Sequence, residues 1–131
     1  MEATASVYYS AISNLLPTPA KSHYLFNLRD FARVIAGVMM TPGPNIPDTA
    51  AVARLWVHEL YRVFYDRLVF DEDRAYLFKN VKEVAKDILG VEFDTIFAEL
   101  NMDEAEHVED RHLRSLVFCD FEDPKGKREA R

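Results

Sequence analysis

Apolar side chains recur at helical spacing between residues 48 and 70, and this stretch constrains the fold more than any other part of the chain. Spacing of three and four residues lines one wide face of an α-helix, whereas a half-buried strand alternates every second residue. Burial of such a face stabilises a domain by roughly 1.5–3 kcal/mol for each large side chain. We therefore expect residues 48–70 to form one long helix, capped by Asp48 or Thr49, that is the spine of a bundle. Its apolar positions are Val52, Leu55, Trp56, Leu60, Val63, Phe64 and Leu68.

Four further segments carry helical spacing, and helix-breaking residues separate them. Pro17 and Pro19 follow the first segment, and a loop with three prolines, residues 41–47, follows the second. An acidic triplet opens the third, and Gly90 follows it at a position typical of a left-handed helix end. The sequence thus predicts an all-α fold, a helical bundle of about five helices, with an extended apolar segment near the C-terminus at 113–121. Besides 48–70, the predicted helices are 5–16, 28–40, 72–89 and 93–100.

The length and composition are typical of one soluble globular domain. The chain has 131 residues, of which 49% are hydrophobic and 29% charged. Its net charge of −6 argues against non-specific binding to nucleic acid or to a microtubule surface. The one cysteine, Cys119, cannot form an internal disulfide, which suits a reducing compartment. No apolar run is long enough to cross a bilayer and no signal peptide opens the chain, so we expect a cytosolic or cytoskeletal protein.

The start of the second predicted helix carries the most suggestive chemistry. Asn27 is a good N-cap, and Asp30 three residues on is suited to complete a reciprocal capping box. Arg29 is unusual there, because the field of a helix N-terminus favours anions by roughly 0.3–1 kcal/mol. Either Arg29 pairs with Asp30 or another carboxylate, or Arg29 and the first-turn amides face a bound anion such as phosphate. Arg33, one turn along the same face, is a weaker candidate for that anion site.

Three features of the sequence predict how this helix and the spine pack. The stripe Leu28, Phe31, Ile35, Val38 and Met39 is expected to face the core. Gly37 costs about 1 kcal/mol relative to alanine inside a helix, and we expect it to mark close helix packing. Trp56, the largest side chain on the spine, is expected to be largely buried.

The sequence lacks the motifs of an independent nucleotide hydrolase. There is no G-x-x-x-x-G-K-S/T loop to cradle phosphates, and no apolar strand ending in paired acids to hold magnesium. His58 and Glu59 begin a pattern similar to the His-Glu-x-x-His zinc helix, but Arg62 occupies the position of the second histidine. We therefore expect no enzyme activity from this chain by itself.

A metal site or a catalytic thiol is not expected in the C-terminal third. The acidic and histidine residues there are not arranged in the close Cys/His pairs of zinc sites, and only one thiol is present. No activating base lies near Cys119 in the sequence. The residues considered were Glu104, Glu106, His107, Asp110, His112 and Cys119.

Four strings of the sequence resemble, in order and spacing, the dynein heavy chain just after the large core of its third AAA+ module. Together they span nearly the whole chain, and Phe-Asn-Leu-Arg-Asp at 26–30 is closer to the axonemal type than to the cytoplasmic type. The strings are residues 15–30, Arg54-Leu55-Trp56-Val57-His58-Glu59, Arg62-Val63-Phe64-Tyr65-Asp66-Arg67-Leu68-Val69 and Phe118-Cys119-Asp120-Phe121.

The resemblance implies that the chain is one piece of a larger motor. Residues 1–121 would form the helical AAA+ lid, and residues 122–131 a flexible charged tail leading towards the next module. Arg29 looks like the sensor-two arginine that reaches a nucleotide phosphate, with ATP or ADP bound only in the full motor. In the isolated chain we expect Arg29 to be solvent-exposed or loosely paired.

The same resemblance implies a role and a set of partners. The lid would help to close over nucleotide at the third module and transmit conformational change around the ATPase ring for microtubule-based motility. Its partners would be the adjacent AAA+ cores of the same heavy chain and, through the whole motor, other dynein chains and microtubules. No nucleic-acid or membrane partner is expected. The expected location is the cytoskeleton of the cytoplasm, in the axoneme of a cilium or flagellum.

The residues themselves also suit a free-standing helical protein-interaction module that binds a partner helix in an apolar groove. Tyr8, Tyr9, Phe93, Phe97 and Phe121 are candidates for such a groove. A lid is expected to leave apolar surface exposed towards its neighbours at both ends of the chain, whereas an independent module is expected to bury its ends.

Overall fold

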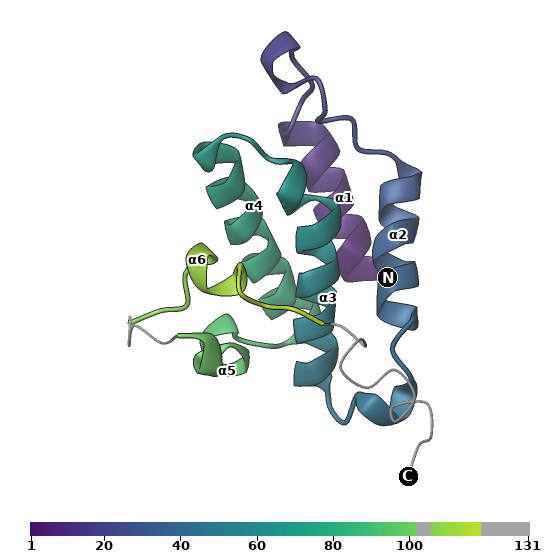
Figure 1. The fold of residues 1–131 in the computed structure, drawn as a ribbon, viewed down its shortest axis with the longest axis vertical. Helices are drawn as coiled ribbons and strands as arrows, with labels where there is room; N and C mark the ends of the chain where they lie inside the picture. The colour runs from purple at the N-terminus through teal and green to yellow at the C-terminus, as the bar shows by residue number, and fades with distance from the viewer. Residues whose placement is uncertain (102–105, 119–131) are drawn as a thin grey trace.

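The computed structural model describes residues 1–101 and 106–118, and these residues form an all-α bundle (Figure 1). The prediction of an all-α fold is therefore confirmed, and the described residues contain no strand. Short 3₁₀ turns at Pro19–Lys21, Gly43–Asn45, Tyr65–Arg67 and Ala98–Leu100 join the helices, and a π-helical turn, Ala85–Leu89, extends the fourth. The helices are α1 (Glu2–Asn14), α2 (Leu28–Met39), α3 (Thr49–Val63), α4 (Asp71–Val84), α5 (Phe93–Ile96) and α6 (Asp110–Leu113).

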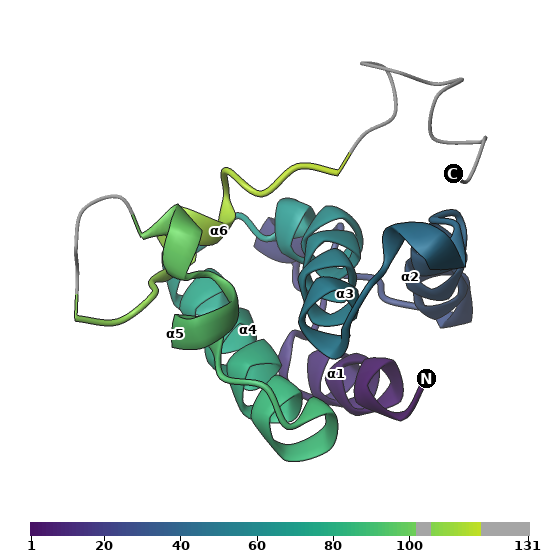
Figure 2. The ribbon, with the colours of Figure 1, turned by 90° about the horizontal axis from the view of Figure 1, so that it is seen from below.

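Helix α3 lies at the centre of the bundle, with α1, α2 and α4 around it (Figures 1 and 2). It packs against α2 and α5, while α1 packs against α2 and α4. The short helices α5 and α6 lie together at one side of the molecule, as the view in Figure 2 shows. The largest fully buried side chains come from several of these elements and include Val7, Tyr24, Val34, Leu60, Phe64, Leu77 and Phe93.

Trp56 confirms that α3 is the spine of the bundle. Its side chain is only 5% exposed. The indole Nε1 donates a hydrogen bond to Oγ1 of Thr4, 3.0 Å away, and Thr4 is itself buried. The contact therefore joins α1 to α3 through a satisfied polar group inside the core.

The predicted single helix over residues 48–70 is wrong at its C-terminal end. The α-helix ends at Val63, and the chain continues through the 3₁₀ turn Tyr65–Arg67 to an extended Leu68. Phe64 and Leu68 are nevertheless fully buried. The apolar spacing persists beyond Val63 because these side chains still reach the core, although the backbone that carries them is no longer α-helical.

The atoms that form three helix boundaries confirm the predicted caps. Asn27 Oδ1 accepts from the Asp30 amide at 3.3 Å, and Asp30 Oδ2 accepts from the Asn27 amide at 3.0 Å, which completes the capping box. Asp48 Oδ1 accepts from the Ala51 amide at 2.7 Å. Gly90 has a φ of 66°, in the left-handed region that favours glycine.

The predicted apolar stripe of α2 is partly wrong. Leu28 and Met39 are exposed, and the buried residues of this helix are Asp30 and Val34. A buried carboxylate therefore lies on the face that packs against the bundle. Helix α2 therefore turns the face that carries Asp30 towards the bundle, where the carboxylate accepts hydrogen bonds from Arg67, as described below.

The C-terminal third differs from the prediction in two ways. The helix predicted at 93–100 is divided into α5 and the 3₁₀ turn Ala98–Leu100. Where an extended segment was predicted from residue 113, α6 first forms one helical turn that buries Leu113. Residues 116–118 then run without helix across α3, where the Phe118 amide donates to Nε2 of His58 at 3.4 Å. Residues 119–121 and the predicted tail, 122–131, lie outside the described residues.

Two of the aromatic residues proposed for an interaction groove belong to the core. Phe93 and Phe97 are fully buried and form an edge-to-face pair. Tyr9 is exposed, and Phe121 lies outside the described residues. None of the helices in the described part of the chain has the length and apolar content needed to cross a bilayer.

Candidate functional site at the first turn of α2

Arg29 lies in the first turn of α2, directly after the cap, and its side chain is exposed. Its backbone amide donates to Asn27 Oδ1 at 2.9 Å, so the turn that carries the side chain is fixed. Within residues 1–101 and 106–118, no ion pair or hydrogen bond occupies its guanidinium group. The Arg29 side chain is thus an exposed cation on a well-held backbone.

Asp30 does not neutralise Arg29. Its carboxylate is 2% exposed and is taken up by a bidentate pair with Arg67, at 2.5 Å from Nη2 to Oδ1 and 3.1 Å from Nη1 to Oδ2. The Asn27 amide and the side chain of Arg33 provide its other donors. The interpretation in which Arg29 pairs with Asp30 is therefore wrong in this structure.

The ionisation of Asp30 follows from these contacts. Burial of the carboxyl favours its neutral form, but the hydrogen bonds from Arg67 and from the Asn27 amide outweigh that effect. The pKa of Asp30 consequently lies below its usual value, and the group is a carboxylate at neutral pH.

The first-turn amides are less available to an anion than the sequence suggests. The amides of Arg29 and Asp30 both donate to the Asn27 side chain, and the Phe31 amide donates to the Asn27 carbonyl at 3.4 Å. The amides of residues 29 to 31 therefore already have acceptors within the chain. An anion at this turn would meet the Arg29 guanidinium rather than the backbone.

Arg33 lies one turn further along α2, and its side chain is 65% exposed. Its Nη1 approaches Asp30 Oδ1 at 3.5 Å, a long contact that an exposed side chain gives up easily. The structure thus places Arg29 and Arg33 on the same surface of α2, with Arg33 partly engaged by the buried carboxylate.

Arg67 is a member of this site that sequence reasoning missed. Its guanidinium donates to the Leu25 carbonyl at 3.2 Å and lies over the Phe26 ring, 5.6 Å from the ring centroid. With the pair to Asp30, these contacts hold the chain on both sides of the Asn27 cap. No sequence signal marks the pairing, because Asp30 and Arg67 are far apart in the chain and belong to different elements.

The loop before α2 is held by a second polar cluster. Tyr24 is 1% exposed, and its hydroxyl donates to Asp73 Oδ2 at 2.9 Å while accepting from the Val69 amide at 3.0 Å. Lys21 Nζ lies 2.6 Å from the same carboxylate oxygen of Asp73. The start of α4 is thereby joined both to this loop and to the segment that follows Arg67.

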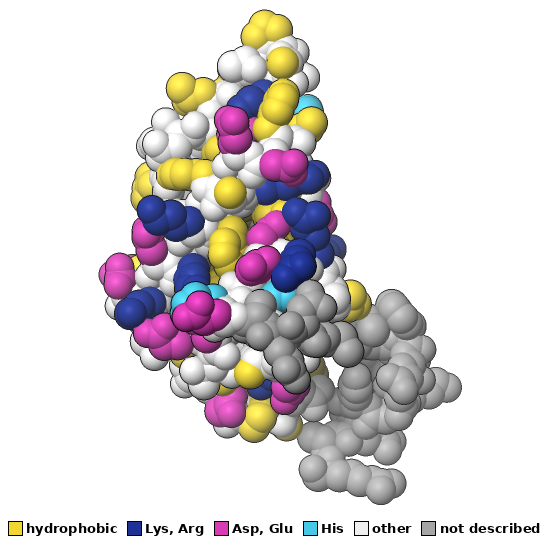
Figure 3. Space-filling view, turned by 90° about the vertical axis from the view of Figure 1, so that its left-hand side faces the viewer, with side chains coloured by type: hydrophobic (Ala, Val, Ile, Leu, Met, Phe, Trp, Pro, Cys, Tyr) yellow, Lys and Arg dark blue, Asp and Glu magenta, His cyan; other side chains and the backbone are white. Residues whose placement is uncertain are grey.

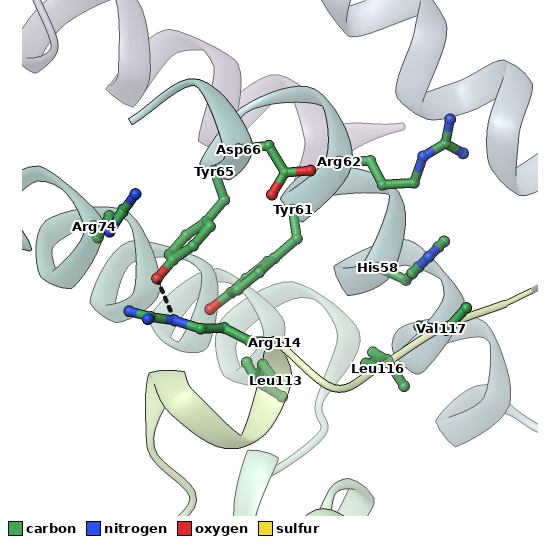
Figure 4. Close-up of a pocket in the computed structure, with 10 residues that line it drawn as sticks. All are labelled: His58, Tyr61, Arg62, Tyr65, Asp66, Arg74, Leu113, Arg114, Leu116 and Val117. Carbon is green, nitrogen blue, oxygen red and sulfur yellow. Dashed lines mark hydrogen bonds between the residues drawn. The ribbon is translucent and has the colours of Figure 1, made fainter. Parts of the chain in front are cut away.

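A hollow of about 420 Å³ lies between α3, the start of α4 and α6 (Figure 4). Tyr61 and Tyr65 stack in its wall with ring centroids 4.3 Å apart. Both hydroxyls donate to the carboxylate of Asp110, and Arg114 donates to that carboxylate and to the Tyr65 hydroxyl. The polar groups at its centre thus satisfy one another.

The two tyrosines of this hollow are hydrogen-bond donors rather than bases. Burial, together with the nearby Asp110 carboxylate, raises the pKa of Tyr65 to about 12 and that of Tyr61 further. Figure 4 shows Arg62 directed away from the tyrosine pair, and its guanidinium pairs with Glu59. The arrangement stabilises the packing of α6 on α3.

The residues that resemble a zinc-helix pattern form a polar cluster on α3, in which His58 and Glu59 are buried and Arg62 is exposed. Glu59 is buried, with Oε1 3.1 Å from His58 Nδ1 and Oε2 3.3 Å from Arg62 Nη1. This carboxylate lies against Gly37 of α2. The cluster is a helix-packing feature.

The other metal-ligand candidates are dispersed. His107 approaches Asp94 at 3.2 Å, whereas His112 is buried and accepts from the Glu109 amide at 3.0 Å. In the part of the chain that the structure describes, no three His, Cys, Asp or Glu side chains are grouped to hold a metal ion. Glu104 and Cys119 lie outside the described residues.

The charged surface is mixed in sign. Figure 3 shows basic and acidic side chains interspersed over the middle of one face, with apolar side chains near its upper end. Ion pairs are also found among the described residues, such as Lys86 with Glu92 at 3.1 Å. Neighbouring opposite charges cancel at a distance, so this face offers no extended field of one sign.

The sequence matches a known protein family. The family described as "AAA+ lid domain" matches residues 1–103. None of the solved structures matches the chain significantly.

The curated relatives are much longer than this chain. It is 42% identical to dynein axonemal heavy chain 3 of Homo sapiens over 126 residues, which is 96% of this chain and 3% of that protein. It is 50% identical to dynein axonemal heavy chain 12 of Mus musculus over 121 residues, 92% of this chain and 4% of that protein. Dynein axonemal heavy chain 1 of Rattus norvegicus is 47% identical over 96 residues, 73% of this chain and 2% of that protein. Over most of its length the chain is similar to a short segment of axonemal dynein heavy chains. The chain therefore belongs to the AAA+ lid domain family.

Proposed function

We propose that this chain is the lid of the third AAA+ module of an axonemal dynein heavy chain, and that the first turn of α2 responds to nucleotide there. The lid helps to close over ATP or ADP held by the preceding core and passes the resulting rotation to the next core. In the complete motor this contributes to microtubule-based motility in the axoneme of a cilium or flagellum.

One observation carries the proposal: Arg29 presents an exposed guanidinium on a backbone turn that is fixed by its cap. The same residue occupies the arginine position of the Phe-Asn-Leu-Arg-Asp string. A charge-assisted bond to phosphate is roughly twice as strong as a neutral hydrogen bond. Such a bond favours the closed lid only by the difference in its strength between the open and closed states.

The chemistry of hydrolysis is assigned to other parts of the motor. One arginine in open solvent offers a nucleotide only a few hydrogen bonds, and association costs at least about 4 kcal/mol in lost freedom of movement. We therefore expect the 131-residue chain to bind ATP no better than about millimolar and to show no ATPase activity.

The proposed partners are the adjacent AAA+ cores of the same heavy chain. Exposed apolar side chains beside the candidate site, Leu25 and Leu28, suit contact with a core, as do Val69 and Phe70. Residues 1–121 are proposed as the lid and 122–131 as the connection to the next module. The alternative of a free-standing interaction module gains no comparable observation, since Phe93 and Phe97 are buried.

The test uses Arg29→Ala in the complete heavy chain that carries this segment. We expect weaker nucleotide-driven release from microtubules, while thermal unfolding of the 131-residue chain stays nearly unchanged because the side chain is exposed. Lys79→Ala is the control, since Lys79 is 78% exposed on α4 with only a long contact to Glu83. A variant that unfolds the lid but leaves release normal would make Arg29 a structural residue and refute the proposal.

A further inference from the structure

Arg67 contacts three successive parts of the chain around the helix cap. It comes from the 3₁₀ turn after α3, and its side chain is 27% exposed. It donates to the Leu25 carbonyl, lies over the Phe26 ring and forms the bidentate pair with Asp30. The first two contacts precede the cap residue and the third follows it, with Arg29 between them in the chain.

We propose that Arg67 is a positioning residue for Arg29: it fixes the first turn of α2 and keeps the Asp30 carboxylate from competing with a nucleotide phosphate for the Arg29 guanidinium. This inference rests on the proposed function, in which Arg29 meets that phosphate.

The geometric part of the inference follows from the shape of the guanidinium. Its planar fork matches a carboxylate at two points, which fixes orientation as well as distance. Because Leu25 and Phe26 are held by the same group, the chain before the cap cannot turn independently of the helix after it. A functional side chain must be held to within about 0.5 Å of its productive position, and such support from neighbouring residues provides it.

The electrostatic part follows from the place of Asp30. It is adjacent to Arg29 in the sequence, buried and ionised, and Arg67 supplies two of its hydrogen bonds. Without Arg67 the carboxylate would draw on the other cations of the turn, Arg33 and Arg29. A phosphate would then compete with a carboxylate for Arg29 and would also be repelled by it.

The same 3₁₀ turn connects α2 to the rest of the bundle. Two residues after Arg67, the Val69 amide donates to the Tyr24 hydroxyl, which in turn donates to Asp73 at the start of α4. A displacement of the end of α3 or the start of α4 therefore carries the first turn of α2 with it. Arg67 adds a direct contact from the 3₁₀ turn to the carboxylate next to Arg29.

The experiment measures the affinity of a fluorescent ATP analogue for the third module in the complete heavy chain, with the other nucleotide sites inactivated. We expect Arg67→Met to weaken binding by about 10- to 100-fold, the scale of a displaced binding group. Arg67→Lys keeps the charge but loses the fork, so a smaller loss is expected. Adding Asp30→Asn to Arg67→Met should recover a large part of the affinity, because the competing charge is removed.

Arg54→Met is the matched control. Arg54 is also a partly buried arginine that pairs with a carboxylate, that of Glu99 at 4.0 Å, but it lies in the first half of α3, away from the turn Tyr65–Arg67. It should leave nucleotide affinity unchanged, and its thermal midpoint measures the general cost of replacing an arginine by methionine in the 131-residue chain. If Arg67→Met fails to fold, the comparison of Arg67→Lys with the unmodified protein decides the question.

The possible results distinguish a failure of the positioning role of Arg67 from a failure of the proposed role of Arg29. If Arg29→Ala leaves affinity unchanged, the proposed function itself fails. If Arg29→Ala weakens binding but folded Arg67 variants bind normally, only the positioning role is overturned. If Arg67→Met weakens binding and Asp30→Asn brings no recovery, the electrostatic part is overturned.

Discussion

Gly37 of α2 lies directly against the carboxylate of Glu59 on α3. A Cβ atom at position 37 would stand 2.0 Å from Glu59 Oε2 and 2.4 Å from its Cδ, far inside van der Waals contact. The two helices approach this closely because position 37 has no side chain, as the sequence predicts from a glycine inside a helix.

Gly37→Ala should therefore destabilise the fold, although alanine is the better helix former. The buried Glu59 side chain would have to move away from His58 and Arg62, and overpacking of this kind typically costs about 1–3 kcal/mol. Urea unfolding measures the change. Gly43→Ala is the control and should be nearly neutral, because nothing lies within 4 Å of a Cβ there. Equal stability of the two variants would contradict the close packing.

Trp56→Ala should cost about 3–5 kcal/mol, the usual range for deleting a buried aromatic side chain. Trp56→Phe keeps most of the volume but loses the hydrogen bond to Thr4, so a cost nearer 1 kcal/mol is expected. Thermal unfolding distinguishes the two. The fluorescence of the unmodified chain should be blue-shifted, and emission like that of free tryptophan would contradict the buried position.

Alkaline pH should weaken the attachment of α6. The folded-state pKa of Tyr65, about 12, exceeds the usual tyrosine pKa of 10.0, so the folded state holds its proton more tightly. Its contribution to stability is thus complete below pH 10.0 and is lost as the pH rises towards about 12. Urea unfolding at increasing pH measures this loss. Tyr65→Phe should show a shallower decline over the same range, and an unchanged slope would contradict the assignment.

Low pH should destabilise the fold through Asp30, just as high pH does through Tyr65. Its pKa in the folded state lies below the usual aspartate pKa of 3.8, so its contribution to stability is complete above pH 3.8 and is lost as the pH falls below that value. Arg67→Met removes a main cause of the lowered pKa. Below pH 3.8 the variant should lose less stability than the unmodified chain, as urea unfolding would report. A steeper loss in the variant would contradict the ion pair.

The segment beyond the family match should be needed for stability. The match ends at residue 103, yet Val108 and Leu113 are each 2% exposed and pack in the core. Leu113→Ala should cost about 2–5 kcal/mol. Val117→Ala, at a 67% exposed position, should be nearly neutral. A chain cut after residue 103 that melts at the unmodified temperature would place residues 106–118 outside the folded unit.

Features encoded by neighbouring residues could be predicted from the sequence. The Asn27 and Asp48 caps and the left-handed Gly90 each depend on residues a few positions apart. The end of α3 could not, because Phe64 and Leu68 keep helical spacing while the backbone between them changes. Helix α6 is not predictable in this way, because a helix of four residues is too short to show apolar periodicity.

In the candidate site, too, local features can be predicted from the sequence and tertiary contacts cannot. Arg29 stands out locally as a cation in a first turn. Adjacency in the sequence suggests Asp30 as its partner. The partner of Asp30 instead comes from another element, because only the tertiary fold brings Arg67 to it. The misplaced stripe of α2 has the same origin, since a pattern of apolar residues does not predict that a carboxylate faces the core.

The loop before α2 and the loop at residues 41–47 differ in how firmly they are anchored to the bundle. This difference determines where a fluorescent label can be attached without disturbing the fold. The loop before α2 is anchored in its middle by the buried Tyr24, so an insertion there would shift α2 and the start of α4 together. In the loop 41–47, residues 42–45 are exposed, and a side chain at Gly43 would meet open space. A fluorophore attached to a Gly43→Cys variant should therefore leave the fold undisturbed. A change in its distance from a second fluorophore on a neighbouring module would then report rotation of the whole domain.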